Sequence, residues 1–171
     1  NPTELITVSQ DASRITHGHL RSQICCALHN LLVAGLLSGD EPAQSLRTAC
    51  GLLAEFAGGS SASPAYASEL ESVFAYPART GSGYVVDCLW SAWDAFTAAG
   101  NYVETVRLAV AYGHDTDTTA AVAGGLAGAW YGLDQVPAEW RADLRLDSPQ
   151  RHMLEQFADA VTSMDDRPGG Y

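Results

Sequence analysis

The sequence contains no lysine, and its nine basic residues are all arginine. Against these stand 20 aspartate and glutamate residues, so that the formal net charge is -11. A chain this acidic does not bind nucleic acid through general electrostatic attraction. It would also repel an anionic substrate, such as a nucleotide diphosphate, unless bound cations or helix N-termini reverse the potential locally. A divalent-metal site would resolve that conflict.

The four cysteines have neither a C-x-x-C spacing nor the density of a disulfide scaffold. Three of them lie within apolar helical patterns, which favours buried, reduced thiols and therefore a cytoplasmic location. His17 and His19, followed by Cys25 and Cys26, are an alternative zinc site. Their spacing, however, matches no standard zinc pattern.

Alternation of polar and apolar residues, which is typical of strands, is also lacking, and apolar residues recur at helical spacing instead. Arg, Asp and Glu interrupt the apolar runs, so we expect no run of membrane-spanning length and no membrane partner. With 171 residues, 47% of them hydrophobic, the chain can bury a substantial core as one domain. The sequence predicts an all-α fold, a compact multi-helix bundle with short connections.

Proline, glycine and asparagine mark the ends of the expected helices. The helix over 18–38 is expected to be central and buried, residues 76–83 form an irregular loop, and residues 165–171 form a polar tail. The other helices are expected to begin near residue 2 and to cover 42–57, 64–74, 84–99, 102–111, 120–131, a short stretch around Trp140, and 149–164.

The segment Gly-His-Asp-Thr-Asp-Thr-Thr, residues 113–119, precedes a helix rich in glycine and alanine. Asp115 and Asp117 lie where a loop becomes a helix, so both carboxylates can turn toward one point. Oxygen ligands suit a hard cation such as Mg²⁺. The alternative is that Thr116 or Asp117 caps the helix. A cap needs one side chain, whereas five consecutive residues here are polar, and adjacent carboxylates repel unless a cation, donors or water lies between them.

These residues, with the helix that ends in Tyr131-Gly132, resemble the carboxy-terminal signature of the ADP-ribosylglycohydrolase family. Two further segments agree in order and spacing. Ser-Arg-Ile-Thr-His-Gly at 13–18 is similar to the family's Ser/Thr-His segment, and Gly-Ser-Gly-Tyr-Val-Val-Asp at 81–87 is similar to its glycine-aromatic segment. The resemblance spans nearly the whole chain.

The resemblance implies an orthogonal all-α bundle that holds two Mg²⁺ ions, with Mn²⁺ as a substitute. It implies a hydrolase that removes ADP-ribose from a modified protein side chain or small molecule. Asp115, Asp117 and Thr118 would bind the metals, Asp115 and Asp117 would be the catalytic carboxylates, and His17 would lie near the substrate ribose. Gly81, Ser82 and Gly83 precede the helix at Tyr84, where their N–H groups suit a phosphate or only form a turn.

The family's remaining metal ligands come from an amino-terminal Thr-Asp-Asp segment, and nothing in this sequence matches it. We therefore expect residues 1–171 to be the carboxy-terminal part of one domain, to need an amino-terminal segment as partner, and to be inactive alone. Another departure is His114, where the family usually has glycine. The competing hypothesis is a non-catalytic protein that binds ADP-ribose or keeps only the fold.

Overall fold

The computed structural model describes residues 1–59 and 64–165, so Ser63 and the expected tail beyond 165 lie outside the described residues. Within the described residues the regular secondary structure is helical, without strands, which confirms the all-α prediction. The chain divides into two compact units, residues 1–136 and 137–171. That both belong to one domain stays a prediction.

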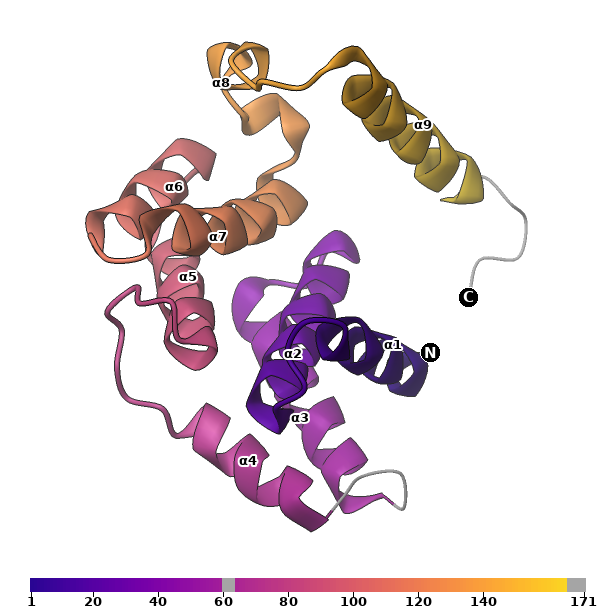
Figure 1. Cartoon of the computed structure of the whole chain (residues 1–171), viewed down its shortest axis with the longest axis vertical. Coiled ribbons are helices and arrows are strands. Elements are labelled where there is room, and N and C mark those ends of the chain that lie inside the picture. The colour runs from indigo at the N-terminus through magenta and orange to yellow at the C-terminus, as the bar shows by residue number, and fades with distance from the viewer. Residues whose placement is uncertain (60–63, 166–171) are drawn as a thin grey trace. The chain divides into compact units, whose positions relative to one another are not determined.

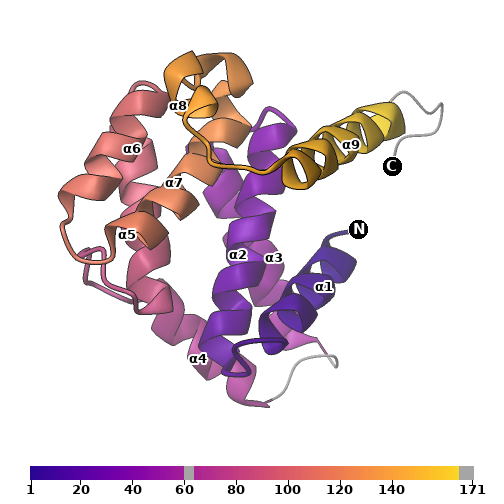
Figure 2. The same cartoon turned by 45° about the horizontal axis from the view of Figure 1, so that its top comes forward.

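The larger unit is built around a central helix (Figures 1 and 2). Its elements are α1 (Pro2–Arg14), α2 (Leu20–Leu37), α3 (Pro42–Gly58), α4 (Pro64–Phe74), α5 (Val85–Ala98), α6 (Tyr102–Ala111), α7 (Thr116–Tyr131) and the short 3-10 helix Leu133–Gln135. Helix α2 packs against α1, α3, α4, α5 and α7. Its residues Ile24, Leu28 and Leu32 have no exposed surface, so the predicted buried central helix is confirmed.

Helix α2 is also long and apolar enough to cross a membrane, by length and composition alone. Over its 18 residues the mean hydropathy is 1.3, and Arg21 is its single charged residue. The expectation that charged residues keep every apolar run too short is therefore wrong for this helix. Half of it is buried inside the structure, and the core helix of a soluble protein meets the same criteria.

Helices α2 and α3 approach closely because Gly35 has no side chain. A Cβ at Gly35 would lie only 2.5 Å from Ser45 Oγ. The buried Ser45 hydroxyl donates a 3.0 Å hydrogen bond to the Leu32 carbonyl, which satisfies its polar atom within the contact. The small residues thus let α3 lie against the central helix.

Helices α5, α6 and α7 pack together on the other side of α2 (Figures 1 and 2). Small side chains allow the close contact, which buries Ala92, Ala95, Ala109 and Ala123. Asn101 caps α6 by accepting a 2.9 Å hydrogen bond from the Glu104 N–H. This packing brings the loop before α5 next to the start of α7.

The smaller unit contains α8 (Ala138–Ala142) and α9 (Ser148–Asp165). These two helices confirm the elements that the sequence predicts around Trp140 and from 149 to 164. The predicted site residues all lie in the larger unit.

Candidate active site

The predicted metal-binding segment lies at the beginning of α7. The helix begins at Thr116, before the predicted start at residue 120, because the polar residues form its first turn. Asp115 is the residue that precedes the helix, and its side chain makes no capping hydrogen bond. Neither Thr116 nor Asp117 is the cap, so that alternative is wrong.

Asp115, Asp117 and Thr118 lie within reach of one another at the surface. The Thr118 side chain, then Asp117, and also the Thr118 backbone N–H hold the pKa of Asp115 below its ordinary value. Asp117 and Thr118 are exposed, while Asp115 is partly buried. A carboxylate that stays ionised beside a second carboxylate and a hydroxyl is a suitable set of oxygen donors for a hard cation.

The loop that precedes α5 is joined to this helix start through Gly81. The Asp115 N–H donates a 2.8 Å hydrogen bond to the Gly81 carbonyl, and the Thr119 hydroxyl donates to the same oxygen at 3.4 Å. Gly81 has a φ of +67°, and a Cβ there would lie 2.4 Å from Tyr112 Cβ, so only glycine fits. Two segments predicted separately are therefore in direct contact.

Gly83 brings the loop backbone against the Asp115 carboxylate. A Cβ at Gly83 would lie 2.7 Å from Asp115 Oδ2, a separation that real side chains do not adopt. The absence of a side chain at Gly83 thus creates the space that the carboxylate occupies.

Asp87 organises this loop, although no pattern in the sequence predicts a role for it. Its buried carboxylate accepts hydrogen bonds from the backbone N–H groups of Thr80 and Ser82, at 2.9 and 2.8 Å, and from both hydroxyls, at 2.5 and 2.6 Å. Burial alone would raise the pKa of Asp87, but these bonds outweigh it and lower the pKa well below the ordinary value. Asp87 therefore fixes the loop as an anion.

These contacts also use donors that are predicted from the sequence to bind a phosphate. The Ser82 N–H and hydroxyl donate to Asp87, and the Gly81 N–H donates to Ser91 Oγ at 3.0 Å. The Gly83 N–H has no hydrogen-bond partner in the part of the chain that the structure describes. Of the three glycine-loop residues, Gly83 is thus the one with a backbone donor available to a ligand.

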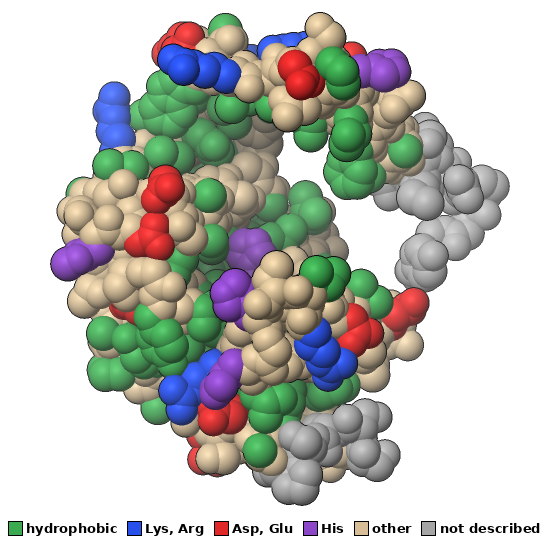
Figure 3. Space-filling view, in the orientation of Figure 1, with side chains coloured by type: hydrophobic (Ala, Val, Ile, Leu, Met, Phe, Trp, Pro, Cys, Tyr) green, Lys and Arg blue, Asp and Glu red, His purple; other side chains and the backbone are tan. Residues whose placement is uncertain are grey.

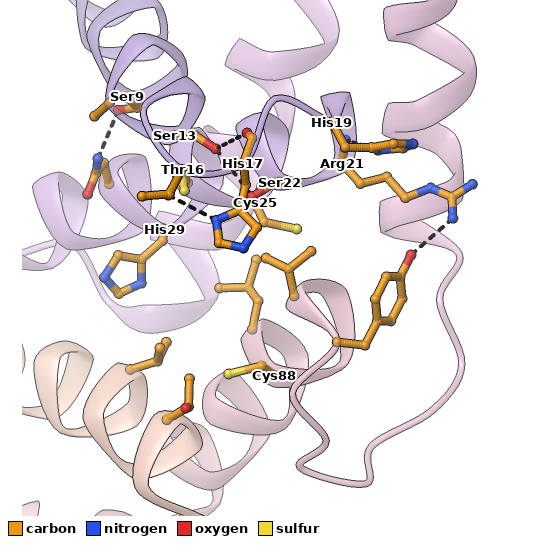
Figure 4. A pocket seen from close by; sticks show the side chains of 18 of the residues that line it. Ser9, Ser13, Thr16, His17, His19, Arg21, Ser22, Cys25, His29 and Cys88 are labelled. Carbon is orange, nitrogen blue, oxygen red and sulfur yellow. Dashed lines mark hydrogen bonds between the residues drawn. The ribbon is translucent and has the colours of Figure 1, made fainter. Parts of the chain in front are cut away.

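A pocket of about 910 Å³ opens beside this loop and collects predicted residues from distant segments (Figure 4). His17, Gly83, Tyr84 and Thr118 all line it. Asp115 and Asp117 are not among its described lining residues, and neither are Gly81 and Ser82. A pocket of this size can accept a nucleotide-sized ligand.

The opposite wall of the pocket comes from α1 and α2, whose lining residues are not predicted from the sequence, apart from His17 just after α1. In the space-filling view, histidine side chains gather near the middle of the face shown, over these helices (Figure 3). The lining residues recur at helical spacing, a pattern that they share with a solvated helix face. They include Ser9, Ser13 and Thr16 on α1 and at its end, and Arg21, Cys25 and His29 along α2.

Arg21 connects three segments at the edge of the pocket. Its Nε donates to Glu69 Oε2 at 2.5 Å, and Nη1 donates to the Tyr84 hydroxyl at 3.0 Å (Figure 4). The hydrogen bond to Tyr84 raises the pKa of Arg21 most, and the hydrogen bond to Glu69 raises it further. The Tyr76 ring packs edge-on against Tyr84 with centroids 5.5 Å apart. Tyr84 is thereby held between α2 and the loop.

His17 follows α1, and its ring is exposed at the pocket. Its Nδ1 lies 2.9 Å from Thr16 Oγ1, and its carbonyl accepts a hydrogen bond from Ser13 Oγ at 3.1 Å. The backbone of His17 is thus fixed by Ser13, and Nε2, the other ring nitrogen of His17, points away from Thr16.

A model of the ADP-ribosylglycohydrolase family matches residues 1–169. The chain belongs to this family. Similar proteins include the ADP-ribosylarginine hydrolase Tri1 of Pseudomonas putida, 33% identical over 89 residues, which are 50% of this chain and 23% of that protein. Tri1 of Serratia proteamaculans is 41% identical over 76 residues, or 44% and 21% of the two chains. ADP-ribosyl-[dinitrogen reductase] glycohydrolase of Rhodospirillum rubrum is 31% identical over 83 residues, or 48% and 28%.

The aligned part of the chain therefore spans about a quarter of the length of these relatives. Within residues 1–59 and 64–165, no three or more His, Cys, Asp and Glu side chains form a group that could hold a metal ion. Asp115, Asp117 and Thr118 are oxygen donors of the type that a hard cation binds, but they are fewer than two ions need, so the two-metal site stays a prediction. The alternative zinc site would use His17, His19, Cys25 and Cys26. Among the described residues these side chains form no group that could hold a metal ion, and the four cysteines are free thiols.

Proposed function

We propose that the protein is a metal-dependent hydrolase that releases ADP-ribose from a modified protein side chain or small molecule. The bond cleaved is the N- or O-glycosidic bond at the anomeric carbon. The observation that carries this proposal is the pocket itself. It places His17, Gly83, Tyr84 and Thr118 together in a chain that matches the ADP-ribosylglycohydrolase family over residues 1–169.

Asp115, Asp117 and Thr118 would hold Mg²⁺, or Mn²⁺ in its place, as part of a site for two ions. When bound, such ions polarise the leaving or ribose oxygens and orient a water molecule. The hydrogen bond from the Asp115 N–H to the Gly81 carbonyl and the missing side chain at Gly83 support this assignment, because they hold the start of α7 against the loop and leave room for the Asp115 carboxylate.

The other residues act on the substrate in this proposal. Cleavage at the anomeric carbon develops positive charge on the ribose, which the carboxylates of Asp115 and Asp117 stabilise. His17 lies beside the ribose. The Gly83 N–H donates to a phosphate oxygen, and Tyr84 borders the ligand at the pocket edge. Gly81 and Ser82 contribute by fixing the loop through Ser91 and Asp87.

The relatives support arginine as one linkage, because two of them are named ADP-ribosylarginine hydrolases. A protein target is supported by the relative named for dinitrogen reductase. Because the aligned part is about a quarter of these relatives, the proposed activity belongs to the full-length protein. A cytoplasmic location is part of the proposal and is supported by the free thiols of the chain.

The test is release of ADP-ribose from ADP-ribosyl-arginine and ADP-ribosyl-serine by the full-length protein. We expect release that requires Mg²⁺ and that Asp117→Ala abolishes. Asp134→Ala, which removes an exposed carboxylate from the short 3-10 helix, should leave the rate unchanged. Residues 1–171 alone should release nothing, because an incomplete ligand set does not hold two ions. Tight ADP-ribose binding without release from any substrate would support the non-catalytic alternative instead.

A further inference from the structure

His29 is a pocket residue to which the proposed mechanism gives no role. It lies on α2 eight residues after Arg21, which places the two about 12 Å apart along the helix axis. Figure 4 shows its ring on the far side of His17 from Arg21 and Tyr84. The pocket therefore extends along α2 well beyond the loop that carries Gly83.

The Nδ1 atom of His29 is buried and has no hydrogen-bond partner within the described residues. Its neighbour Asn30 differs, since Asn30 Nδ2 donates to Ser9 Oγ at 2.8 Å. A buried polar atom without a partner destabilises the folded state and calls for a functional explanation. Burial also lowers the pKa of His29, so its ring is neutral at neutral pH. A neutral imidazole has one nitrogen that accepts a hydrogen bond. Because Nδ1 is buried out of reach of a ligand, the ring carries its proton there and accepts at Nε2.

The wall that α7 contributes to the same pocket carries Thr118 and, one helical turn later, Val122. Thr118 is a proposed metal ligand, so the bond to be cleaved lies near it. Val122 continues this wall beyond Thr118, so the pocket has room there for the group attached to the anomeric carbon. His29 and Val122 both line that pocket.

We propose that His29 accepts a hydrogen bond from the guanidinium group of an ADP-ribosylated arginine and so favours the arginine linkage over the serine linkage. This rests on the proposed function. An arginine keeps several N–H donors after ADP-ribosylation, whereas the serine oxygen becomes the linkage atom and keeps none. No aspartate or glutamate occurs among the described lining residues, so no lining carboxylate competes with His29 for these N–H donors. A neutral ring also avoids repulsion of the cation.

The experiment replaces His29 by leucine in the full-length protein and measures kcat/KM on both substrates. Loss of a hydrogen bond to a charged group corresponds to a decrease in kcat/KM of roughly 10- to 100-fold. We expect that loss for ADP-ribosyl-arginine and a change within about twofold for ADP-ribosyl-serine, which is below the effect of one such bond. His29→Gln keeps an accepting oxygen and should restore most of the arginine activity. His152→Leu, on α9 and not among the described lining residues, should change neither rate.

The thermal stability of the ligand-free protein provides a second measurement. His29→Leu removes the unpartnered nitrogen and should raise Tm while it lowers arginine-linked activity. An unchanged arginine-to-serine ratio, or an equal loss on both substrates, would overturn the role of His29. If the wild-type protein releases ADP-ribose from neither substrate, the proposed function fails separately. In that case the affinities of the wild-type protein and His29→Leu for the two substrates are measured by calorimetry. Equal affinities of the two proteins for ADP-ribosyl-arginine would contradict the role of His29.

Discussion

The backbone N–H of Asp115 donates a 2.8 Å hydrogen bond to the carbonyl of Gly81, 34 positions earlier in the sequence. This bond joins the start of α7 to the glycine loop before α5. It places the carboxylate proposed to bind a metal next to the backbone proposed to bind a phosphate. The geometry of either segment therefore depends on the other.

Gly83→Ala should disturb the metal site without unfolding the protein. The new Cβ would lie 2.7 Å from Asp115 Oδ2, so the carboxylate must move. We expect the Mg²⁺ concentration for half-maximal activity to rise about tenfold, which corresponds to about 1.4 kcal/mol. Gly51→Ala, on α3 with nothing within 4 Å of the new Cβ, is the matched control. A metal titration with the same midpoint in both variants would contradict the contact.

Asp87→Asn should loosen the loop and lower the free energy of unfolding. The amide replaces one accepting oxygen, which leaves hydrogen bonds from Thr80 or Ser82 unmade in a buried site. We expect a loss of about 2–4 kcal/mol, measured by denaturant unfolding at pH 7. Ser91→Ala removes only the 3.4 Å contact to the same carboxylate and the bond to the Gly81 N–H, so it should destabilise less.

The same residue predicts how stability depends on pH. The pKa of Asp87 is lowered by folding, so the unfolded chain binds a proton first as the pH falls. Its contribution is fully present above the unfolded pKa of about 4 and is lost as the pH falls further toward the folded pKa. Wild-type stability should therefore decrease below about pH 4, and Asp87→Asn should show a shallower decrease. Parallel curves would show that Asp87 is not the group responsible.

Arg21 and Tyr84 should affect substrate binding as one unit. Arg21→Gln and Tyr84→Phe each remove the hydrogen bond that holds Tyr84 at the pocket edge. We expect each to raise KM by roughly fivefold, as for one ordinary hydrogen bond, with kcat little changed. The KM of the double variant should be no higher than that of either single variant, and a double-mutant cycle measures this comparison. Arg47→Gln removes the same charge from an exposed position on α3 and serves as the control. Fully additive effects would show that the two side chains act separately.

Much of the fold follows from local sequence signals. Apolar residues at helical spacing predict 18–38 and 102–111, where the structure has Leu20–Leu37 and Tyr102–Ala111. Asn101 and the proline residues mark helix starts because their effects are local. The start of α7 is missed by four residues, since threonine and aspartate favour caps and turns as readily as a first helical turn.

The site is only partly predictable, because its contacts join positions far apart in the sequence. The order of three segments identifies His17, Gly83, Tyr84 and Thr118, and the structure places them in one pocket. The bond between Arg21 and Tyr84 spans 63 positions and leaves no local pattern. Serine residues of α1 that line the pocket have the same pattern as a solvated helix face. Asp87 resembles an ordinary acidic residue in a first helical turn, so its role in the loop emerges only from the hydrogen bonds.

The central claim is that oxygen donors at the start of α7 support metal-dependent release of ADP-ribose. It is tested most directly with full-length protein treated with EDTA, then supplied again with Mg²⁺, while ADP-ribose released from ADP-ribosyl-arginine is measured over time. We predict that EDTA stops release, that Mg²⁺ restores it in the wild-type protein, and that Mg²⁺ does not restore it in Asp117→Ala. Undiminished release in EDTA, or a wild-type rate in Asp117→Ala, would contradict the account.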